Sequence, residues 1–109
     1  MTLNEYQQQA HTTSGNIVIG HSIVYPTLGL ANEAGEFAGK VKKLFRDKDG
    51  ELSDATRLAL NLELGDVLWY LSECATQMGT SLGQIAEFNL AKLSMRKQRG
   101  TIHGDGDER

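Results

Sequence analysis

The chain has 109 residues, of which 39% are hydrophobic and 23% are charged, a composition typical of one globular domain and unlike that of a disordered chain. A formal net charge of −3 argues against a protein whose main task is to bind nucleic acid, and no stretch approaches the about 20 apolar residues of a membrane span. Cys74 is the single cysteine and cannot form an intramolecular disulfide, and MTLNEYQQQA at the N-terminus lacks the features of a signal peptide, so we expect a cytoplasmic protein.

Residues 1–24 are predicted to form a short helix followed by a loop. Thr2 and Glu5 have the spacing of a capping box, and the apolar residues Leu3, Tyr6 and Ala10 then recur at helical intervals. The segment 17–26, IVIGHSIVYP, is rich in β-branched residues but has no obvious partner strand. We interpret it as a loop or an irregular helix.

Three longer helices are predicted after this loop. Pro26 is tolerated at a helix start, and a 3.6-residue apolar period runs from Thr27 to about residue 46. After the polar turn DKDGELS, Ser53 is a suitable N-cap for a helix that reaches about residue 78. Ser81 and Gln84 form a second capping box, which opens a helix to residue 99 with Gly100 just beyond its end. Residues 100–109 are expected to be a flexible tail.

These elements predict a single all-α domain over residues 1–109. It is a helical bundle of a short N-terminal helix plus three longer helices, because no stretch shows the alternation of a strand. The helix 53–78 is apolar nearly all round, which is typical of a helix at the centre of a fold or at an interface. We therefore expect oligomerisation to complete the bundle, as a homodimer or a homotetramer.

Two pairs of acidic residues share the same spacing. Glu33 and Glu36 lie three residues apart, as do Glu63 and Asp66, so each pair projects from one face of its helix. If the two helices pack antiparallel, as their short connection favours, the pairs meet in a cluster of four carboxylates. Two unit charges about 4 Å apart repel by about 4 kcal/mol at an effective dielectric of 20, so such a cluster requires protons or cations.

A divalent metal ion is the natural counter-ion for this cluster. No Lys or Arg lies between Arg57 and Lys92, so the sequence offers the second pair no nearby cation. Carboxylate oxygens without His or Cys favour Mg²⁺, for which Mn²⁺ can substitute. The alternative is that the acids form a solvated face, with Glu36 and Lys40 as an ordinary ion pair one turn apart.

Glycines accompany both acidic pairs. Gly35 and Gly65 lie inside the pairs and Gly39 lies one turn beyond the first, although a glycine inside a helix costs about 1 kcal/mol relative to alanine. We expect close approach of the helix backbones to explain this cost.

The last helix carries a stripe of polar and cationic residues that overlaps its apolar sector. Asn89, Lys92, Arg96 and Arg99 fall at i, i+3, i+7 and i+10. Cations beside a divalent metal site are what a polyphosphate requires. For Arg99 the alternative is a simple favourable interaction with the helix C-terminus. Trp69 and Tyr70 follow Asp66 closely, and one of them could stack on a nucleobase, although core or dimer packing is the better explanation for both.

The motifs Asn32-Glu33-Ala34-Gly35-Glu36 and Glu63-Leu64-Gly65-Asp66 resemble the EExxE and ExxD signature of the MazG-like all-α nucleoside triphosphate pyrophosphohydrolases. The surrounding LGLANEAGEFAGKVKK and ELGDVLWYL, and the closing NLAKLSMRKQRGTIHGDGDER, are also similar to that family. The resemblance covers roughly residues 25–109. One departure is Asn32, which stands where the family motif has its first Glu.

The resemblance implies Mg²⁺-dependent hydrolysis of a (deoxy)nucleoside triphosphate to the monophosphate and pyrophosphate, by metal-activated attack of water at the α-phosphorus. It implies the following roles: metal ligation by Glu33, Glu36, Glu63 and Asp66; proton acceptance by Glu33 or Glu36; phosphate binding by Lys92, Arg96 and Arg99; and nucleoside contacts by Asn89 and Trp69. Deoxyribonucleotides are favoured by analogy. The alternative function is a non-catalytic helical oligomerisation module, which would have no use for four acids at matched spacing.

Overall fold

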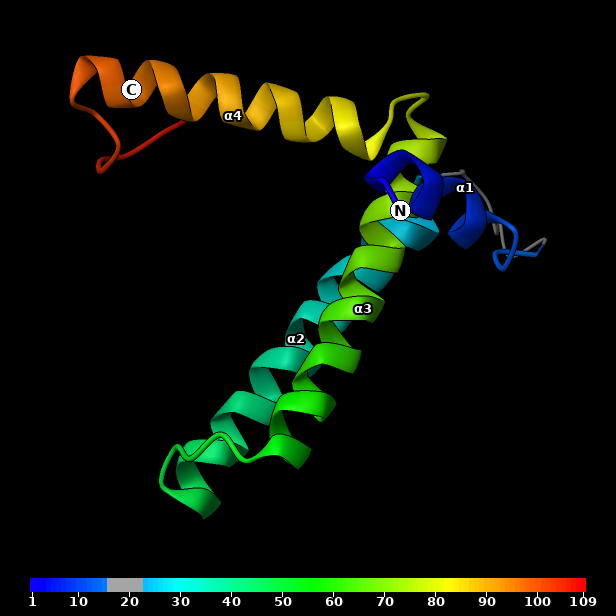
Figure 1. Ribbon diagram of the computed structural model, residues 1–109, viewed down its shortest axis with the longest axis vertical. Helices are drawn as coiled ribbons and strands as arrows, with labels where there is room; N and C mark the ends of the chain where they lie inside the picture. Colours follow the sequence, from blue (N-terminus) through cyan, green and yellow to red (C-terminus); the bar gives the residue numbers. More distant parts are fainter. Residues whose placement is uncertain (16–22) are drawn as a thin grey trace.

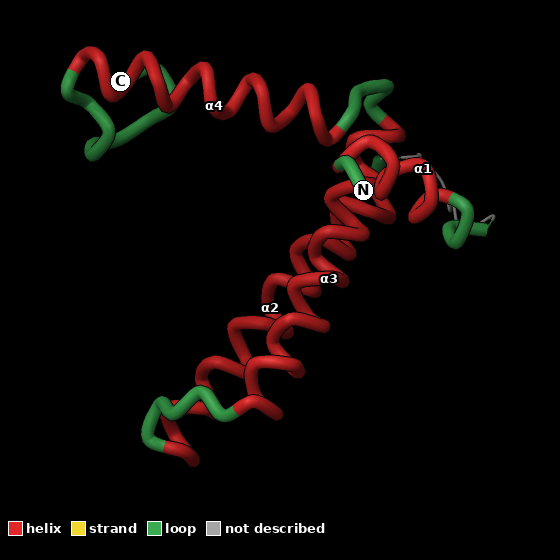
Figure 2. The backbone as a smooth tube through the Cα atoms, in the orientation of Figure 1, coloured by secondary structure: helices red, strands yellow, loops and turns green. Residues whose placement is uncertain are grey.

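The protein is all-α in the parts that the computed structural model describes, residues 1–15 and 23–109 (Figures 1 and 2). The elements are α1 (Leu3–His11), α2 (Val24–Lys48), α3 (Asp54–Gln77) and α4 (Leu82–Arg99). This confirms the predicted fold class and the short first helix followed by three longer ones.

Side-chain caps begin three of the four helices, as predicted. Thr2 Oγ1 accepts a hydrogen bond from the Glu5 amide, and Ser53 Oγ accepts one from the Thr56 amide. Ser81 Oγ does the same for Gln84 at the start of α4. Each bond satisfies one of the backbone donors that the first turn of a helix leaves without a partner.

The start of α2 differs from the prediction. The helix begins at Val24 rather than at Thr27, and its N-cap residue Ile23 provides no side-chain cap. Pro26 falls in the first turn, where the missing amide hydrogen costs nothing. The last residues of the segment interpreted as a loop or irregular helix are therefore helical, while residues 17–22 of it lie outside the described part of the chain.

Helices α2 and α3 form a hairpin and lie side by side along most of their length (Figure 1). A tight turn joins them, in which Asp49 and Gly50 both adopt the left-handed conformation, with φ of 54° and 76°. Asp and Gly are among the residues that tolerate this conformation best. The turn makes the two helices antiparallel, as the sequence predicted.

The buried side chain of Gln7 holds helix α1 against the junction of α3 and α4. The amide nitrogen of Gln7 donates to Thr76 Oγ1 at 3.1 Å and to the Thr80 carbonyl at 3.0 Å. Its oxygen accepts from the Leu82 amide at 2.7 Å, in a buried setting. Because both ends of the Gln7 side chain are satisfied, its burial carries little penalty.

Two further contacts hold α1 in place. Asn4 Oδ1 accepts a hydrogen bond from the Gly83 amide at 2.9 Å. At the other end of the helix, His11 Nδ1 lies 3.2 Å from an oxygen of Glu73, a buried carboxylate on α3. Helix α1 therefore contacts both α3 and α4.

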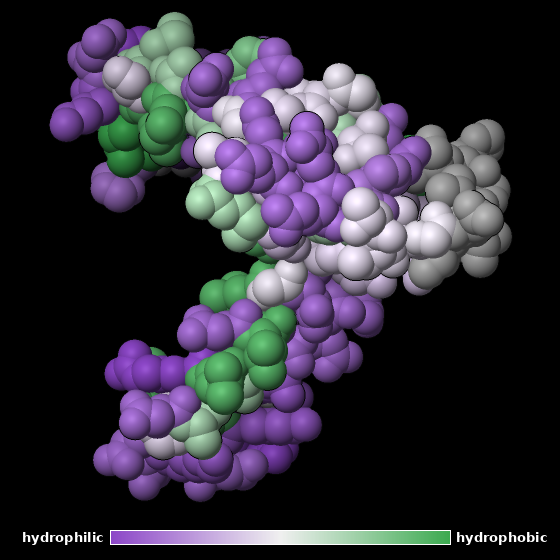
Figure 3. Space-filling model, turned by 45° about the vertical axis from the view of Figure 1, so that its right-hand side comes forward, coloured by the Kyte–Doolittle hydropathy of each residue, from purple (hydrophilic) through white to green (hydrophobic). Residues whose placement is uncertain are grey.

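The molecule is open rather than compact. Helix α4 runs away from the α2–α3 hairpin, and the space-filling view is hollowed between the two (Figures 1 and 3). The radius of gyration is 16.7 Å, against about 13 Å for a compact domain of 100 residues. Among the described residues, the buried apolar side chains are Ala10, Pro26, Leu44, Ala75 and Leu82.

Large apolar side chains remain exposed along the helices, and apolar surface is visible over the hairpin in Figure 3. On α3, Leu58 and Leu62 are 60% and 64% exposed. None of the described helices is both long and apolar enough to cross a membrane.

Candidate metal centre

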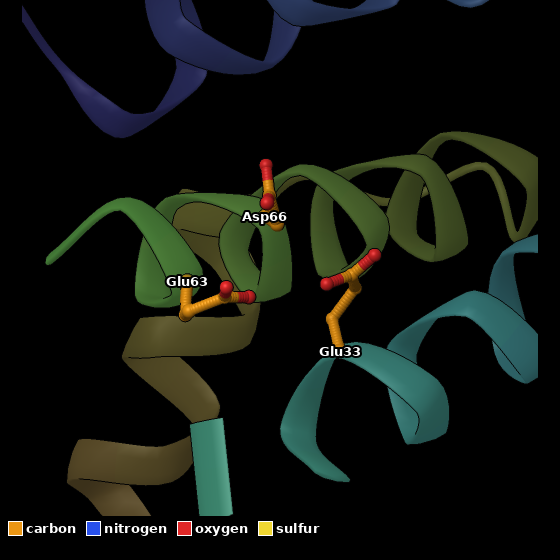
Figure 4. Close-up of side chains that lie close together, drawn as sticks. All are labelled: Glu33, Glu63 and Asp66. Carbon is orange, nitrogen blue, oxygen red and sulfur yellow. The ribbon is translucent and has the colours of Figure 1, made fainter. Parts of the chain in front are cut away.

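Three carboxylates converge between α2 and α3. Glu33 comes from α2, while Glu63 and Asp66 come from consecutive turns of α3 (Figure 4). Each offers an oxygen, and these oxygens all lie within 4.8 Å of one another. Glu33 and Glu63 are half-buried, and Asp66 is exposed. We call these three residues the acidic cluster.

Glu36 lies one helical turn beyond Glu33 and is not among the three carboxylates that converge. It is exposed. Its charge still acts on the site, since it is one of the groups that raise the pKa of Glu33. The structure therefore assembles three of the four predicted carboxylates, with the fourth at the edge.

The charge state of Glu33 reflects its surroundings. Desolvation raises the pKa of its carboxyl above the ordinary value of 4.5, and the charges of Asp66, Glu63 and Glu36 raise it further. A carboxylate among like charges holds a proton more readily. A cation beside Glu33 would offset this local excess of negative charge.

A lysine from the neighbouring helix supplies one positive charge. Lys40 Nζ lies 3.4 Å from Glu63 Oε1, and the Glu63 side chain is 18% exposed. The expectation that the second acidic pair has no cation nearby is therefore wrong, because it considered only α3. Lys40 pairs across the hairpin with Glu63 rather than along its own helix with Glu36.

Tyrosines lie beside one end of the acidic cluster. The pKa of Tyr70 is raised by burial, by a hydrogen bond with Tyr25 and by the charges of Glu33 and Asp66. The pKa of Tyr6 is raised by burial and by the charge of Asp66. Tyr70 follows Asp66 by four residues, so the two share a helix face, and the sequence had already indicated that it lies near the acids.

Trp69 lies next to this group. Its indole N–H donates to Thr13 Oγ1 at 2.8 Å, and its ring meets Tyr70 edge-to-face with centroids 4.9 Å apart. The Tyr25 and Tyr70 rings are 6.2 Å apart. Trp69 is half-buried, so it belongs to an aromatic group beside the cluster.

The glycines of the acidic motifs do not mark close approach of the helices. A Cβ added at Gly35, Gly39 or Gly65 would meet none of the described atoms within 4 Å. The expected explanation is therefore wrong within this chain. The close approach occurs instead at Gly29, where a Cβ would lie 2.1 Å from the Tyr70 ring.

The basic end of α4 lies away from the acidic cluster of the same chain (Figure 1). Lys92 Nζ and the Arg96 guanidinium each lie 3.1 Å from Asp107 Oδ1 in the tail, and these two cations lower the pKa of Asp107. Arg99 donates to the Arg109 carbonyl. Asn89 is exposed on the same helix.

Residues 100–109 fold back against α4 and cover Arg96. Besides the Asp107 carboxylate, the Arg96 guanidinium donates to the carbonyl of Asp107 at 2.9 Å, and only 6% of the Arg96 side chain is exposed. Arg109 donates to the carbonyls of Thr101 and Ile102. The predicted phosphate-binding arginine is thus engaged by the tail in the isolated chain.

Comparisons with known proteins agree with the arrangement of the acids. The family described as "MazG nucleotide pyrophosphohydrolase domain" matches residues 26–101, a span that contains both acidic motifs. The "Gene 37 protein" of Mycobacterium phage L5 is 51% identical over 85 residues, which are 78% of this chain and 75% of that protein. No solved structure matches. The chain therefore belongs to the MazG nucleotide pyrophosphohydrolase family.

Proposed function

We propose that the protein hydrolyses nucleoside triphosphates, with deoxyribonucleotides favoured, to the monophosphate and pyrophosphate in the presence of Mg²⁺. One observation carries this proposal: the oxygens of Glu33, Glu63 and Asp66 converge within 4.8 Å in a chain of the MazG family. In the reaction, a water oxygen bonds to the α-phosphorus and the bond to the α–β bridging oxygen breaks, so that pyrophosphate leaves.

The residues present fit a hard divalent cation. Three carboxylates face one another with one ammonium group, Lys40, beside them, so the cluster carries excess negative charge. Oxygen ligands without nitrogen or sulfur favour Mg²⁺ or Mn²⁺. Glu33, Glu63 and Asp66 would hold the ion, with Glu36 next to them. When bound, it would lower the pKa of a water molecule and neutralise phosphate charge.

Glu33 and Glu36 are the proposed proton acceptors. Glu33 is the better placed of the two, because it is half-buried among the converging carboxylates, whereas Glu36 is exposed and lies one turn away. The Glu33 carboxylate oxygen would take the proton from the attacking water, while Glu36 at the exposed edge would exchange protons with solvent.

The remaining site residues are proposed to come from more than one chain. Lys92, Arg96 and Arg99 lie away from the acidic cluster of their own chain, so the phosphate contacts of α4 would reach a neighbouring copy in a homodimer or homotetramer. Trp69 would contact the nucleoside from beside the cluster and Asn89 from α4. The exposed leucines of α3 support such an assembly.

The test is to incubate the protein with a panel of NTPs and dNTPs and Mg²⁺ or Mn²⁺, and to identify the products. We expect a monophosphate and pyrophosphate in equal amounts. Glu63→Gln and Asp66→Asn should each lower the rate by more than about a hundredfold while circular dichroism shows the same helix content. Glu87→Gln, an exposed acid on α4, is the matched control and should retain full activity.

Release of single phosphates would contradict the proposal. Complete inactivity across the panel would also contradict it, and would favour the alternative of a helical oligomerisation module.

A further inference from the structure

A groove of about 360 Å³ lies between α2 and α3, nearer the turn of the hairpin than the acidic cluster is. Lys40 belongs to both features, since it lines the groove and its Nζ lies 3.4 Å from Glu63 Oε1. The other lining residues that matter here are Lys43, Lys48, Thr56 and Leu60. We call this feature the lysine groove. Thr56 precedes Glu63 by seven residues, which is about 10 Å along a helix.

Leucine and alanine side chains line much of the lysine groove, and its three lysines give it an excess of positive charge over Asp47. Lys43 and Lys48 both line it, and among the described residues neither forms an ion pair with a carboxylate. Asp47 also lines it, but Arg46 holds the Asp47 carboxylate at 2.7 Å and so offsets its charge. The first turn of α3 adds the positive end of a helix dipole at Thr56.

The surroundings of the acidic cluster differ at its two ends. Tyr6, Tyr70 and Trp69 lie on one side, beyond Asp66 along α3. The lysine groove lies on the other side, before Glu63 along α3, and no aromatic residue lines it. Aromatic rings stack on nucleobases, whereas ammonium groups bind phosphate oxygens. A nucleotide lying across the cluster therefore has a preferred direction.

From this arrangement, and resting on the proposed function, we infer that the lysine groove binds the pyrophosphate end of the substrate. The nucleoside then points toward the aromatic group, and the α-phosphate lies at the acidic cluster. Lys40 is a positioning residue between the acidic cluster and the lysine groove. A divalent ion at the cluster would replace Lys40 as the counter-ion of Glu63, and the Lys40 ammonium group would then be available to the phosphates. Lys43 and Lys48 bind the pyrophosphate group, which leaves in the reaction.

The test measures binding of inorganic pyrophosphate by calorimetry in the presence of Mg²⁺. Lys43→Ala should weaken this binding about tenfold, the loss expected for one charged hydrogen bond. Lys42→Ala is the matched control, because Lys42 is the exposed neighbour on α2 and does not line the groove. It should change the affinity by less than about twofold. Lys43→Arg should retain most of the binding.

Binding of a nucleoside monophosphate gives the direction of the substrate. Lys43→Ala should leave it unchanged, since the monophosphate does not reach the groove. A larger loss for the monophosphate than for pyrophosphate would show that the groove holds the nucleoside and would overturn the inference. An equal loss in Lys42→Ala and Lys43→Ala would also overturn it, as would failure of the unmodified protein to bind pyrophosphate.

A second variant and a parallel activity assay complete the test. If Lys43→Ala does not fold, Lys48→Ala at the last residue of α2 tests the same groove. Turnover of triphosphates is measured in parallel. If the unmodified protein hydrolyses none of them but binds pyrophosphate through Lys43, the proposed function fails and the anion site stands.

Discussion

The carboxylates of the acidic cluster differ in what offsets their charge. Glu63 has the ammonium group of Lys40 at 3.4 Å, and Asp66 is exposed to water. Glu33 is half-buried and forms no ion pair with the described residues, and its pKa is raised by burial and by its acidic neighbours. The ionised form of Glu33 is therefore disfavoured in the metal-free site.

Removing the charge of Glu33 should stabilise the metal-free protein. A raised pKa in the folded state means that the folded chain binds this proton more readily than the unfolded chain does. The protein with Glu33 therefore loses stability as the pH rises from the ordinary Glu pKa of 4.5 through the raised value, whereas a protein with a neutral side chain at this position does not. We expect Glu33→Gln to raise the Tm at neutral pH, with no gain at acidic pH where both side chains are neutral.

Thermal unfolding followed by circular dichroism, with a metal chelator present, measures this gain. Glu87→Gln serves as the control, since Glu87 is an exposed acid outside the cluster. An equal rise in Tm in both variants would attribute the effect to net charge and count against repulsion at the site.

The sequence predicted that acids of the two helices meet, but it also placed Glu36 in the cluster, and it did not show how the charges are offset. The repeated three-residue spacing and the short connection sufficed to bring Glu33 to Glu63 and Asp66. The partner of Lys40 was not predictable in this way. Lys40 lies one turn from Glu36 on its own helix, and only the rotation of α2 against α3 decides that it reaches Glu63 instead.

Local signals located the helix ends well, and long-range contacts decided the rest. Thr2, Ser53 and Ser81 cap as predicted because capping depends on three or four consecutive residues. The direction of α4 depends on Gln7, which bonds the Leu82 amide across 75 residues of chain. No local pattern in the sequence predicts such a contact. The position of the cationic residues of α4 relative to the acidic cluster was therefore not predictable.

At the level of helix packing, Gly29 of α2 leaves room for the Tyr70 ring of α3. A Cβ at this position would overlap that ring, which also lies beside the Tyr25 ring, with centroids 6.2 Å apart. We expect Gly29→Ala to lower the free energy of unfolding by about 1–3 kcal/mol, the usual cost of overpacking. Urea denaturation measures the change.

Gly39→Ala is the matched control for this prediction. Gly39 lies on the same helix, and a Cβ there meets none of the described atoms within 4 Å. The better helix propensity of alanine should offset any loss of stability in Gly39→Ala. A Gly29→Ala protein as stable as Gly39→Ala would mean that the Tyr70 ring moves aside at no cost.

At the scale of the whole molecule, a single chain leaves many of its large apolar side chains exposed to solvent. Few apolar side chains are buried among the described residues, while Leu58, Leu62 and Leu64 stay exposed on α3. Figure 3 shows apolar surface over the hairpin, and large exposed apolar patches usually mark an interface. The helix predicted to be central is half uncovered, which agrees with the proposal that a second copy packs against the hairpin.

Light scattering after size exclusion tests this assembly. We expect a mass of two or four chains of 12.0 kDa each. Leu62→Lys should shift the protein toward the single chain, because a buried interface cannot accept an unpaired charge. Asn61→Lys, the same charge on the adjacent exposed residue, should shift it much less. A single-chain mass for the unmodified protein at every concentration would exclude the assembly.

The position of Trp69 gives the protein a built-in optical reporter. It is the single tryptophan of the chain, and its indole bonds Thr13 just beyond α1 while its ring touches Tyr70 beside the acidic cluster. Undocking of α1 would hydrate the indole and move its fluorescence emission to longer wavelength. Loading of the cluster would alter the same emission through the tyrosine, so the state of the site is readable without any label.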